Sequence, residues 1–173
     1  NSGPVKFQAS GKQIKNSPYN AFWDYEFINT YENGVRMIGT TEGPRGLKFE
    51  GSDGWLFVAI HGGALSASNR EILPPKIQAG GNVSIKDPIP DDFQVRLGRS
   101  PGHHRNFIDS VISRKPPMAT AEIGHRTAKI CHLNNMAMKL GRTLKWNPQR
   151  EAIVDDRAAG QLLVPPMRAP WSV

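Results

Sequence analysis

Residues 23–40, with the sequence WDYEFINTYENGVRMIGT, decide the fold of this chain. Aromatic and polar residues alternate from Trp23 to Tyr31, which is the period of two that a half-buried β-strand requires. Glu32-Asn33-Gly34 follows, and Asn-Gly favours a hairpin turn because both residues tolerate a positive φ. Residues 35–40 then predict the returning strand. We therefore expect antiparallel β-structure in the first half of the chain.

A second hairpin and an earlier strand extend this β-structure in both directions. Residues 5–9 alternate apolar and polar side chains, as one more strand requires. Residues 47–51 alternate in the same way, an Asp-Gly turn follows, and the apolar residues Trp55, Phe57 and Ala59 continue beyond it. We expect an open, mostly antiparallel sheet over residues 1–62, with edges that need protection.

The middle of the chain has a different character. Residues 64–73 predict one short helix. Pro74-Pro75 then begins a segment rich in glycine and proline, which we expect to form a loop over residues 74–92. A loop of this length inside a compact domain is usually functional or disordered.

The second half of the chain, residues 102–163, is predicted to be helical. Its longest helix has clear end signals, because Thr120 is a good N-cap and Gly141 is a natural C-cap. The remaining elements are shorter: a helix at 102–113, a strand at 144–146, a helix at 155–163 and an extended, docked tail at 164–173.

These elements predict an α+β fold, in which helices cover one face of an open, mostly antiparallel sheet. We expect residues 1–173 to form a single domain. The pairs Gly62-Gly63 and Gly80-Gly81 lack the G-x-G-x-x-G spacing of a dinucleotide-binding turn. The sequence therefore predicts no Rossmann domain and no cofactor site within this chain.

The basic second half of the chain has two interpretations. The net charge is +7, and residues 96–150 hold eleven Lys and Arg against Asp109 and Glu122. Such a stretch can attract nucleic acid, a phosphorylated ligand or an acidic partner. We interpret it as a solvated helical face and expect no nucleic acid, because no helix-turn-helix or zinc-finger spacing occurs and no aromatic residues are interleaved for stacking.

The sequence leaves the cellular location open. No apolar run approaches the roughly 20 residues needed to span a bilayer, so we expect no membrane span. Cys131 is the sole cysteine, which fits a reducing compartment but leaves both the bacterial cytoplasm and the periplasm open. The chain begins at Asn1 rather than methionine, which indicates a fragment, a processed product or an engineered piece.

The five histidines do not predict a metal site. His103 and His104 are adjacent, so on a helix they point about 100° apart. His125 and His132 are seven residues apart, which is roughly 10 Å along a helix axis. No acidic residue completes a cluster with them. Nothing resembles a nucleophile elbow either, so we expect neither a metal site nor a hydrolytic active site.

The run GHRT at residues 124–127 is the most suggestive of ligand binding. It places the imidazole of His125 and the fixed cation of Arg126 in the first turns of the long helix. Helix N-termini favour anionic or oxygen-rich ligands, and arginine can bind a hydroxyl pair or a carboxylate through two hydrogen bonds. The alternative is a helix start that only docks against the sheet.

Short runs along nearly the whole chain share one resemblance. The most telling are EIGHRT at 122–127, CHL at 131–133, LGR at 140–142, LKWNP at 144–148 and PMRAPW at 166–171. The others are YENGVRM at 31–37, GSDGW at 51–55, NFIDS at 106–110 and SRK at 113–115. Together and in this order, they resemble the bacterial-type C-terminal domain of the glucose–fructose oxidoreductase, inositol dehydrogenase and MocA (Gfo/Idh/MocA) family.

The resemblance implies one half of a two-domain, nicotinamide-dependent oxidoreductase. In that family an N-terminal Rossmann domain binds NAD or NADP and contributes a catalytic lysine. The family's Asp and His acid/base pair would precede Asn1. This chain has no counterpart of the Rossmann domain, the lysine or the acid/base pair. The resemblance therefore implies no catalytic and no cofactor-binding residue here, and no hydride transfer by the chain alone.

The resemblance also implies what this domain contributes. It would bind part of a sugar, sugar derivative or cyclitol, and its open sheet face would form a homo-oligomer. The substrate-binding candidates are His125 and Arg126, with Tyr19 and Asn20 in the loop before the second strand. The alternative hypothesis is a stand-alone, non-enzymatic binding or assembly module that uses the same sheet.

Overall fold

The computed structural model describes residues 3–60, 64–79, 100, 102–164 and 166–170. The chain divides into two compact units. The large unit comprises Asn1–Thr41 and Ser100–Val173, and the small unit comprises Glu42–Arg99. Each unit combines antiparallel strands with helices, so the predicted α+β class is confirmed.

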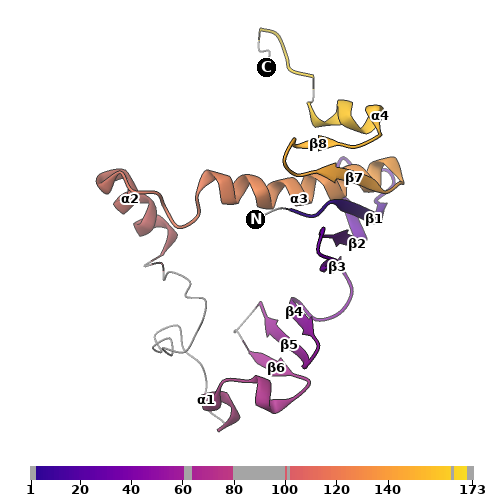
Figure 1. Cartoon of the computed structure of the whole chain (residues 1–173). Coiled ribbons are helices and arrows are strands. Elements are labelled where there is room, and N and C mark those ends of the chain that lie inside the picture. Colours follow the sequence, from indigo (N-terminus) through magenta and orange to yellow (C-terminus); the bar gives the residue numbers. More distant parts are fainter. Residues whose placement is uncertain (1–2, 61–63, 80–99, 101, 165, 171–173) are drawn as a thin grey trace. The chain divides into compact units, whose positions relative to one another are not determined.

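The large unit contains a five-stranded sheet in the order β3-β2-β1-β7-β8 (Figure 1), and every neighbouring pair in it is antiparallel. Its strands are β1 (Lys6–Gln13), β2 (Phe22–Thr30), β3 (Arg36–Thr40), β7 (Leu144–Asn147) and β8 (Ala152–Ile153). The predicted hairpin turn is confirmed, since Gly34 adopts a φ of 86° between β2 and β3. The sequence did not predict β8, because two residues are too few to show an alternating pattern.

The long helix α3 (Ala121–Leu140) covers one face of this sheet (Figure 1). Both predicted caps are confirmed: the hydroxyl of Thr120 accepts a hydrogen bond from the Ile123 amide at 3.3 Å, and Gly141 is left-handed with a φ of 62°. Across the sheet, Phe7 pairs with both Asn29 and Leu144, so these three side chains share one face. The buried hydrophobic core consists of Phe7, Leu133, Met136, Ala137, Leu144, Trp146 and Ala159.

The small unit has its own three-stranded antiparallel sheet in the order β4-β5-β6. Its strands are β4 (Gly46–Gly51), β5 (Gly54–Ala59) and β6 (Leu65–Ala67). The second predicted hairpin is therefore confirmed. The strands of the first half are divided between two sheets, however, whereas the sequence predicts them in one.

The helix predicted over residues 64–73 is wrong. The structure has β6 there, followed by a short 3-10 turn, η1 (Arg70–Ile72). The apolar side chains Leu65 and Ala67 alternate with serines and pair with β5, so the period of two outweighs the helical propensity. The helix α1 (Pro75–Gln78) lies at the start of the predicted loop. Residues 80–92 of that loop lie outside the described residues.

Within its described residues, the large unit holds three further helical elements, α2 (His103–Ser113), α4 (Arg157–Gly160) and η2 (Gln161–Leu163). The first confirms the helix predicted at 102–113, and the other two fall within the helix predicted at 155–163. The described tail residues 166–170 form no helix or strand, and the docking of this tail stays a prediction.

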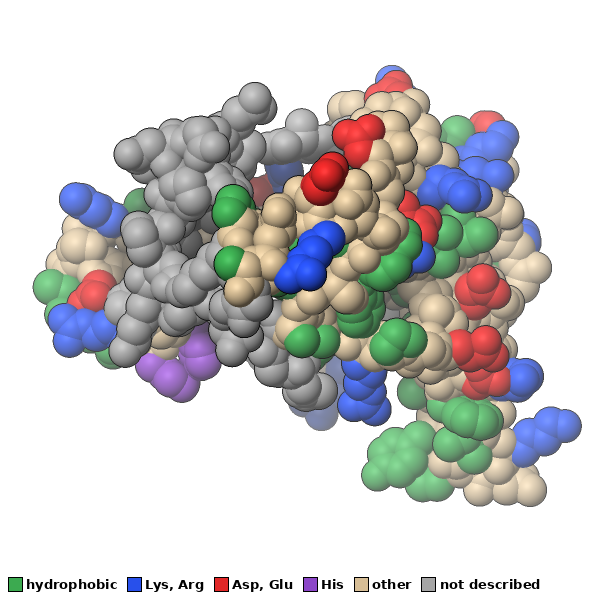
Figure 2. Space-filling model, turned by 90° about the horizontal axis from the view of Figure 1, so that it is seen from below, with side chains coloured by type: hydrophobic (Ala, Val, Ile, Leu, Met, Phe, Trp, Pro, Cys, Tyr) green, Lys and Arg blue, Asp and Glu red, His purple; other side chains and the backbone are tan. Residues whose placement is uncertain are grey.

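Some hydrophobic side chains lie at the surface. The apolar positions of α2 are exposed, namely Phe107, Ile108, Val111 and Ile112. Figure 2 shows hydrophobic side chains on one face of the molecule, together with basic side chains that lie among acidic ones. These four side chains of α2 are not part of the buried core of the large unit.

Candidate functional site

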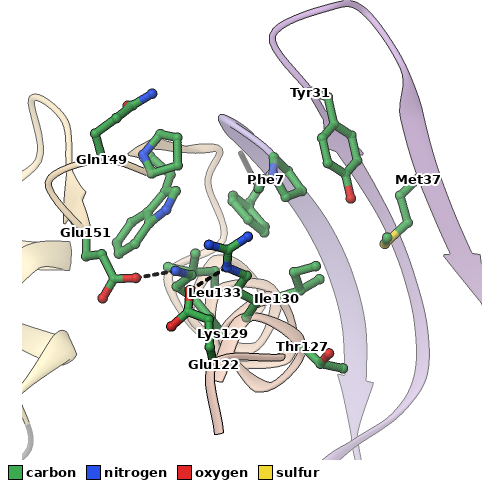
Figure 3. Close-up of a pocket in the computed structure, with 15 residues that line it drawn as sticks. Phe7, Tyr31, Met37, Glu122, Thr127, Lys129, Ile130, Leu133, Gln149 and Glu151 are labelled. Carbon is green, nitrogen blue, oxygen red and sulfur yellow. Dashed lines mark hydrogen bonds and ion pairs between the residues drawn. The ribbon is translucent and has the colours of Figure 1, made fainter. Parts of the chain in front are cut away.

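A pocket with a volume of about 440 Å³ lies in the large unit beside the first turns of α3 (Figure 3). Tyr31 and Met37 bound it on the side of β2 and β3, and Gln149 and Glu151 bound it on the opposite side. Side chains of α3 form its base between these two sides. Segments that are far apart in the sequence therefore meet around one pocket.

Charged side chains on the pocket wall form two close pairs. The Nε atom of Arg126 donates to Glu122 Oε1 at 2.5 Å, one helical turn away on α3. The ammonium of Lys129 donates to Glu151 in the turn between β7 and β8. Figure 3 shows both interactions as dashed lines. Helix α3 therefore supplies both cations of the pocket.

Glu151 is the residue at which several contacts of the site converge. Besides Lys129, it contacts His125, whose Nε2 atom lies 3.0 Å from Oε1 and 3.1 Å from Oε2. These hydrogen bonds, first from Lys129 and then from His125, lower the pKa of Glu151 below its ordinary value. The carboxylate therefore stays ionised, as an acceptor of hydrogen bonds, throughout the neutral pH range.

The backbone holds Glu151 in an unusual conformation. Its φ is 49°, a left-handed value that few residues other than glycine adopt. The turn before it is built by Asn147, whose side-chain oxygen accepts from the amides of Gln149 at 3.0 Å and Arg150 at 2.9 Å. Residues in sparsely populated backbone conformations of this kind cluster at functional sites.

The remaining wall of the pocket is apolar. Phe7, Leu133 and Trp146 belong to the buried core and also line the pocket. The Lys129 ammonium lies 5.7 Å from the centroid of the Trp146 ring, within the range of a cation–π interaction. The pocket thus joins an aromatic and aliphatic wall to a rim of hydrogen-bonding groups.

The predicted site residues lie in two different places. Arg126 lines the pocket, and His125 is hydrogen-bonded to Glu151 at its edge. Tyr19 and Asn20 lie in the connection between β1 and β2, at the opposite end of the hairpin from the pocket. Because β1 has 8 residues, the two ends of the hairpin are about 25 Å apart. The role of all four residues in substrate binding stays a prediction.

The sequence did not predict the contributions of Lys129 and Glu151. Lys129 lies one helical turn after His125, so a scan of the helix face that carries His125 could have found it. Glu151 is 22 residues further along the chain than Lys129, and no periodic pattern connects the two. Glu151 lies in the turn between β7 and β8. The pairing of β7 with β1 and with β8 brings this turn beside α3.

Other kinds of site find no support in the described residues. Within them, no group of three or more His, Cys, Asp or Glu side chains could hold a metal ion. In the same part of the chain, no helix has the length and apolar character needed to cross a bilayer. All strand pairs described are antiparallel, whereas a dinucleotide-binding fold is built on parallel βαβ units. The described strands therefore do not form the parallel βαβ unit of a Rossmann fold.

The fold and the pocket define the class of this protein as an α+β domain with open antiparallel sheets. A family model described as "Oxidoreductase family, C-terminal alpha/beta domain", of the Gfo/Idh/MocA group, matches residues 83–173. This match covers more than half of the chain, so the chain belongs to that oxidoreductase family.

A solved structure supports the same fold. The chain is similar to an NAD-binding protein from Listeria innocua, with a TM-score of 0.54 and 16% sequence identity. The similarity covers 84% of this chain and 46% of that one, so the chain spans about half the length of this relative. A comparison with curated proteins finds no match.

Proposed function

We propose that this chain is the substrate-side domain of a nicotinamide-dependent oxidoreductase, and that its pocket binds part of a sugar, sugar derivative or cyclitol. One observation carries the proposal: the pocket beside α3 combines an aromatic and aliphatic wall with a rim of paired, hydrogen-bonding side chains. The family supports the oxidoreductase part of the proposal.

A sugar or cyclitol ring matches a pocket that has an apolar wall and a hydrogen-bonding rim. Such a ring has faces of C–H groups, which pack on apolar surfaces, and a rim of hydroxyls, which both donate and accept hydrogen bonds. Hydrogen bonds from hydroxyls to ionised groups are stronger than those between neutral groups. The volume of about 440 Å³ also falls in the range of roughly 300–1,000 Å³ that small-molecule sites occupy.

The proposal assigns the cofactor to another part of the protein. The similar protein from Listeria innocua is an NAD-binding protein and is about twice as long as the matched region. Since the described strands form no parallel βαβ unit, we propose that a separate Rossmann domain binds NAD or NADP. This chain would then hold and orient the substrate, and it would transfer no hydride by itself.

Saturation-transfer NMR with D-glucose and myo-inositol tests the binding part of the proposal. We expect signal transfer to at least one of them. The variant Thr127→Trp should abolish the transfer, because Thr127 lines the pocket and a large side chain there fills it. The matched control is Ala128→Trp, on an exposed neighbouring position that does not line the pocket. Equal loss in both variants, or no transfer with the unmodified chain, would contradict the proposal.

We further propose that the chain forms a homo-oligomer through the sheet of the small unit. Leu47 and Phe49 are 61% and 59% exposed, and they pair with Val58 and Leu56, so all four side chains share one face. An apolar sheet face of this kind is typical of an interface between subunits. The same observation favours the alternative function, an assembly module that binds no substrate.

Sedimentation velocity tests the oligomer and separates the two functions. We expect a dimer or larger species, which Phe49→Glu should convert to a monomer with an unchanged circular dichroism spectrum. The control is Lys48→Glu, because neighbouring strand residues lie on opposite faces of the sheet. A monomeric unmodified chain would contradict the oligomer. An oligomer that binds neither D-glucose nor myo-inositol would favour the assembly module.

A further inference from the structure

The charges that line the pocket cancel. Among the described residues on its wall, the cations are Arg126 and Lys129 and the carboxylates are Glu122 and Glu151. Each cation contacts one of these carboxylates. The chain as a whole carries a net charge of +7, so the neutral pocket differs from the basic average of the molecule.

This pairing has a consequence for an anionic ligand. A carboxylate or phosphate group would have to compete with Glu122 for Arg126 and with Glu151 for Lys129. It would also lie beside two carboxylates, and like charges at short range repel each other. A hydroxyl is uncharged and meets neither obstacle. The pairs therefore disfavour an anion even though both cations are present.

Glu151 retains the capacity to bind a hydroxyl. An ionised carboxylate offers about four lone-pair sites on its two oxygens. Lys129 donates to Oε1, and His125 lies within hydrogen-bond distance of both oxygens. A hydroxyl that points its hydrogen at Glu151 can therefore still be accepted. The lowered pKa of Glu151 keeps this acceptor ionised.

Resting on the proposed function, we infer that Glu151 makes this pocket select an uncharged, hydroxyl-rich ring over the same ring bearing a carboxylate or a phosphate. Its carboxylate accepts a ligand hydroxyl, and it also occupies the Lys129 ammonium, which would otherwise attract an anion. Glu151 is thus a specificity-determining residue that the sequence pattern did not reveal.

Matched ligand pairs test this selectivity. The probes are D-glucose against D-glucuronate, and myo-inositol against myo-inositol 1-phosphate, each titrated calorimetrically into the chain. We expect the uncharged member of a pair to bind about tenfold more tightly. The variant Glu151→Gln removes the charge at nearly constant side-chain volume. In this variant the ratio of the two affinities should fall to about one or reverse, because Lys129 loses its carboxylate partner. The control Glu71→Gln makes the same change in the small unit and should keep the unmodified ratio.

The outcomes separate the inference from the proposed function. An unmodified chain that prefers the anionic member, or a ratio that Glu151→Gln leaves unchanged, would overturn the inference and leave a carbohydrate pocket in place. Binding of no member of either pair would overturn both. Circular dichroism of Glu151→Gln shows whether the variant is folded, and the conservative variant Glu151→Asp should retain part of the selectivity if the first variant unfolds.

Discussion

The two halves of α3 belong to one continuous helix but have different surroundings. From Ala121 to Ala128 the residues are exposed, whereas Leu133, Met136 and Ala137 in the second half are buried in the core. The exposed half supplies Glu122 and Arg126, two of the charged residues that line the pocket. The buried half attaches the helix to the sheet. The buried core and the charged rim of the candidate site therefore depend on different turns of the same helix, and substitutions should separate them.

The largest expected effect is on folding, from Leu133→Ala in the buried half. Leu133 is 1% exposed, and removing a buried leucine side chain leaves a cavity that costs about 2–5 kcal/mol. The control Ile123→Ala lies in the exposed half, at 51% exposure, and should change the free energy of unfolding by less than about 0.5 kcal/mol. Urea denaturation followed by circular dichroism measures both. Similar losses of unfolding free energy in the two variants would show that both halves of α3 contribute equally to the stability of the fold.

The next effect is on binding, from Arg126→Ala in the exposed half. We expect the dissociation constant for the best-binding sugar or cyclitol to rise about tenfold, because Arg126 and its partner Glu122 form part of the pocket rim. The control is Arg105→Ala, which breaks a similar pair with Asp109 four residues away on α2. Calorimetry should detect the change in the first variant alone. Unchanged binding in Arg126→Ala would place the ligand elsewhere.

A smaller effect on stability is expected at the start of α3. Thr120→Ala removes the oxygen that accepts from the Ile123 amide, and the loss of such a cap costs about 1 kcal/mol. Thr120→Ser keeps that oxygen and should restore most of the stability. Urea denaturation of the two variants provides the comparison. An unchanged free energy of unfolding in Thr120→Ala would mean that the exposed half frays without affecting the fold.

The smallest effect concerns acid stability at the other end of α3. The Arg142 guanidinium donates to Asp156 at 2.8 and 3.0 Å, and this contact lowers the pKa of Asp156 to about 2. Because the folded pKa lies below the unfolded value of about 3.9, the contribution is fully present above pH 4 and is lost as the pH falls toward 2. Asp156→Asn, which can still cap α4, should show a smaller fall in Tm across this window. Thermal melts at several pH values measure this fall in Tm. The same dependence of Tm on pH in Asp156→Asn and in the unmodified chain would contradict the lowered pKa of Asp156.

Much of the fold could be predicted from the sequence, because local patterns determine it. The alternation from Trp23 to Tyr31, the Asn-Gly turn and the caps at Thr120 and Gly141 each act over a few residues. The short strand β6 was missed because pairing with β5, rather than local propensity, sets its conformation. The division into two sheets was missed for the same reason, since strand partners are not encoded locally.

The candidate site was predictable only in part. Arg126 was found because arginine near a helix start favours oxygen-rich ligands, and it does line the pocket. Glu151 depends on a left-handed residue in a turn that sheet pairing brings beside α3. Tyr19 and Asn20 lie at the far end of the β1–β2 hairpin, where no sequence pattern could relate them to the pocket.

The most direct test of the central claim is to map amide chemical-shift changes in the nitrogen-15-labelled chain as myo-inositol or D-glucose is added. We predict that the largest changes fall on residues 122–130 and 147–151, around the pocket beside the exposed half of α3. Changes confined to the β1–β2 connection near Tyr19 and Asn20, or to the small unit, would contradict this account, as would the absence of any change at saturating ligand.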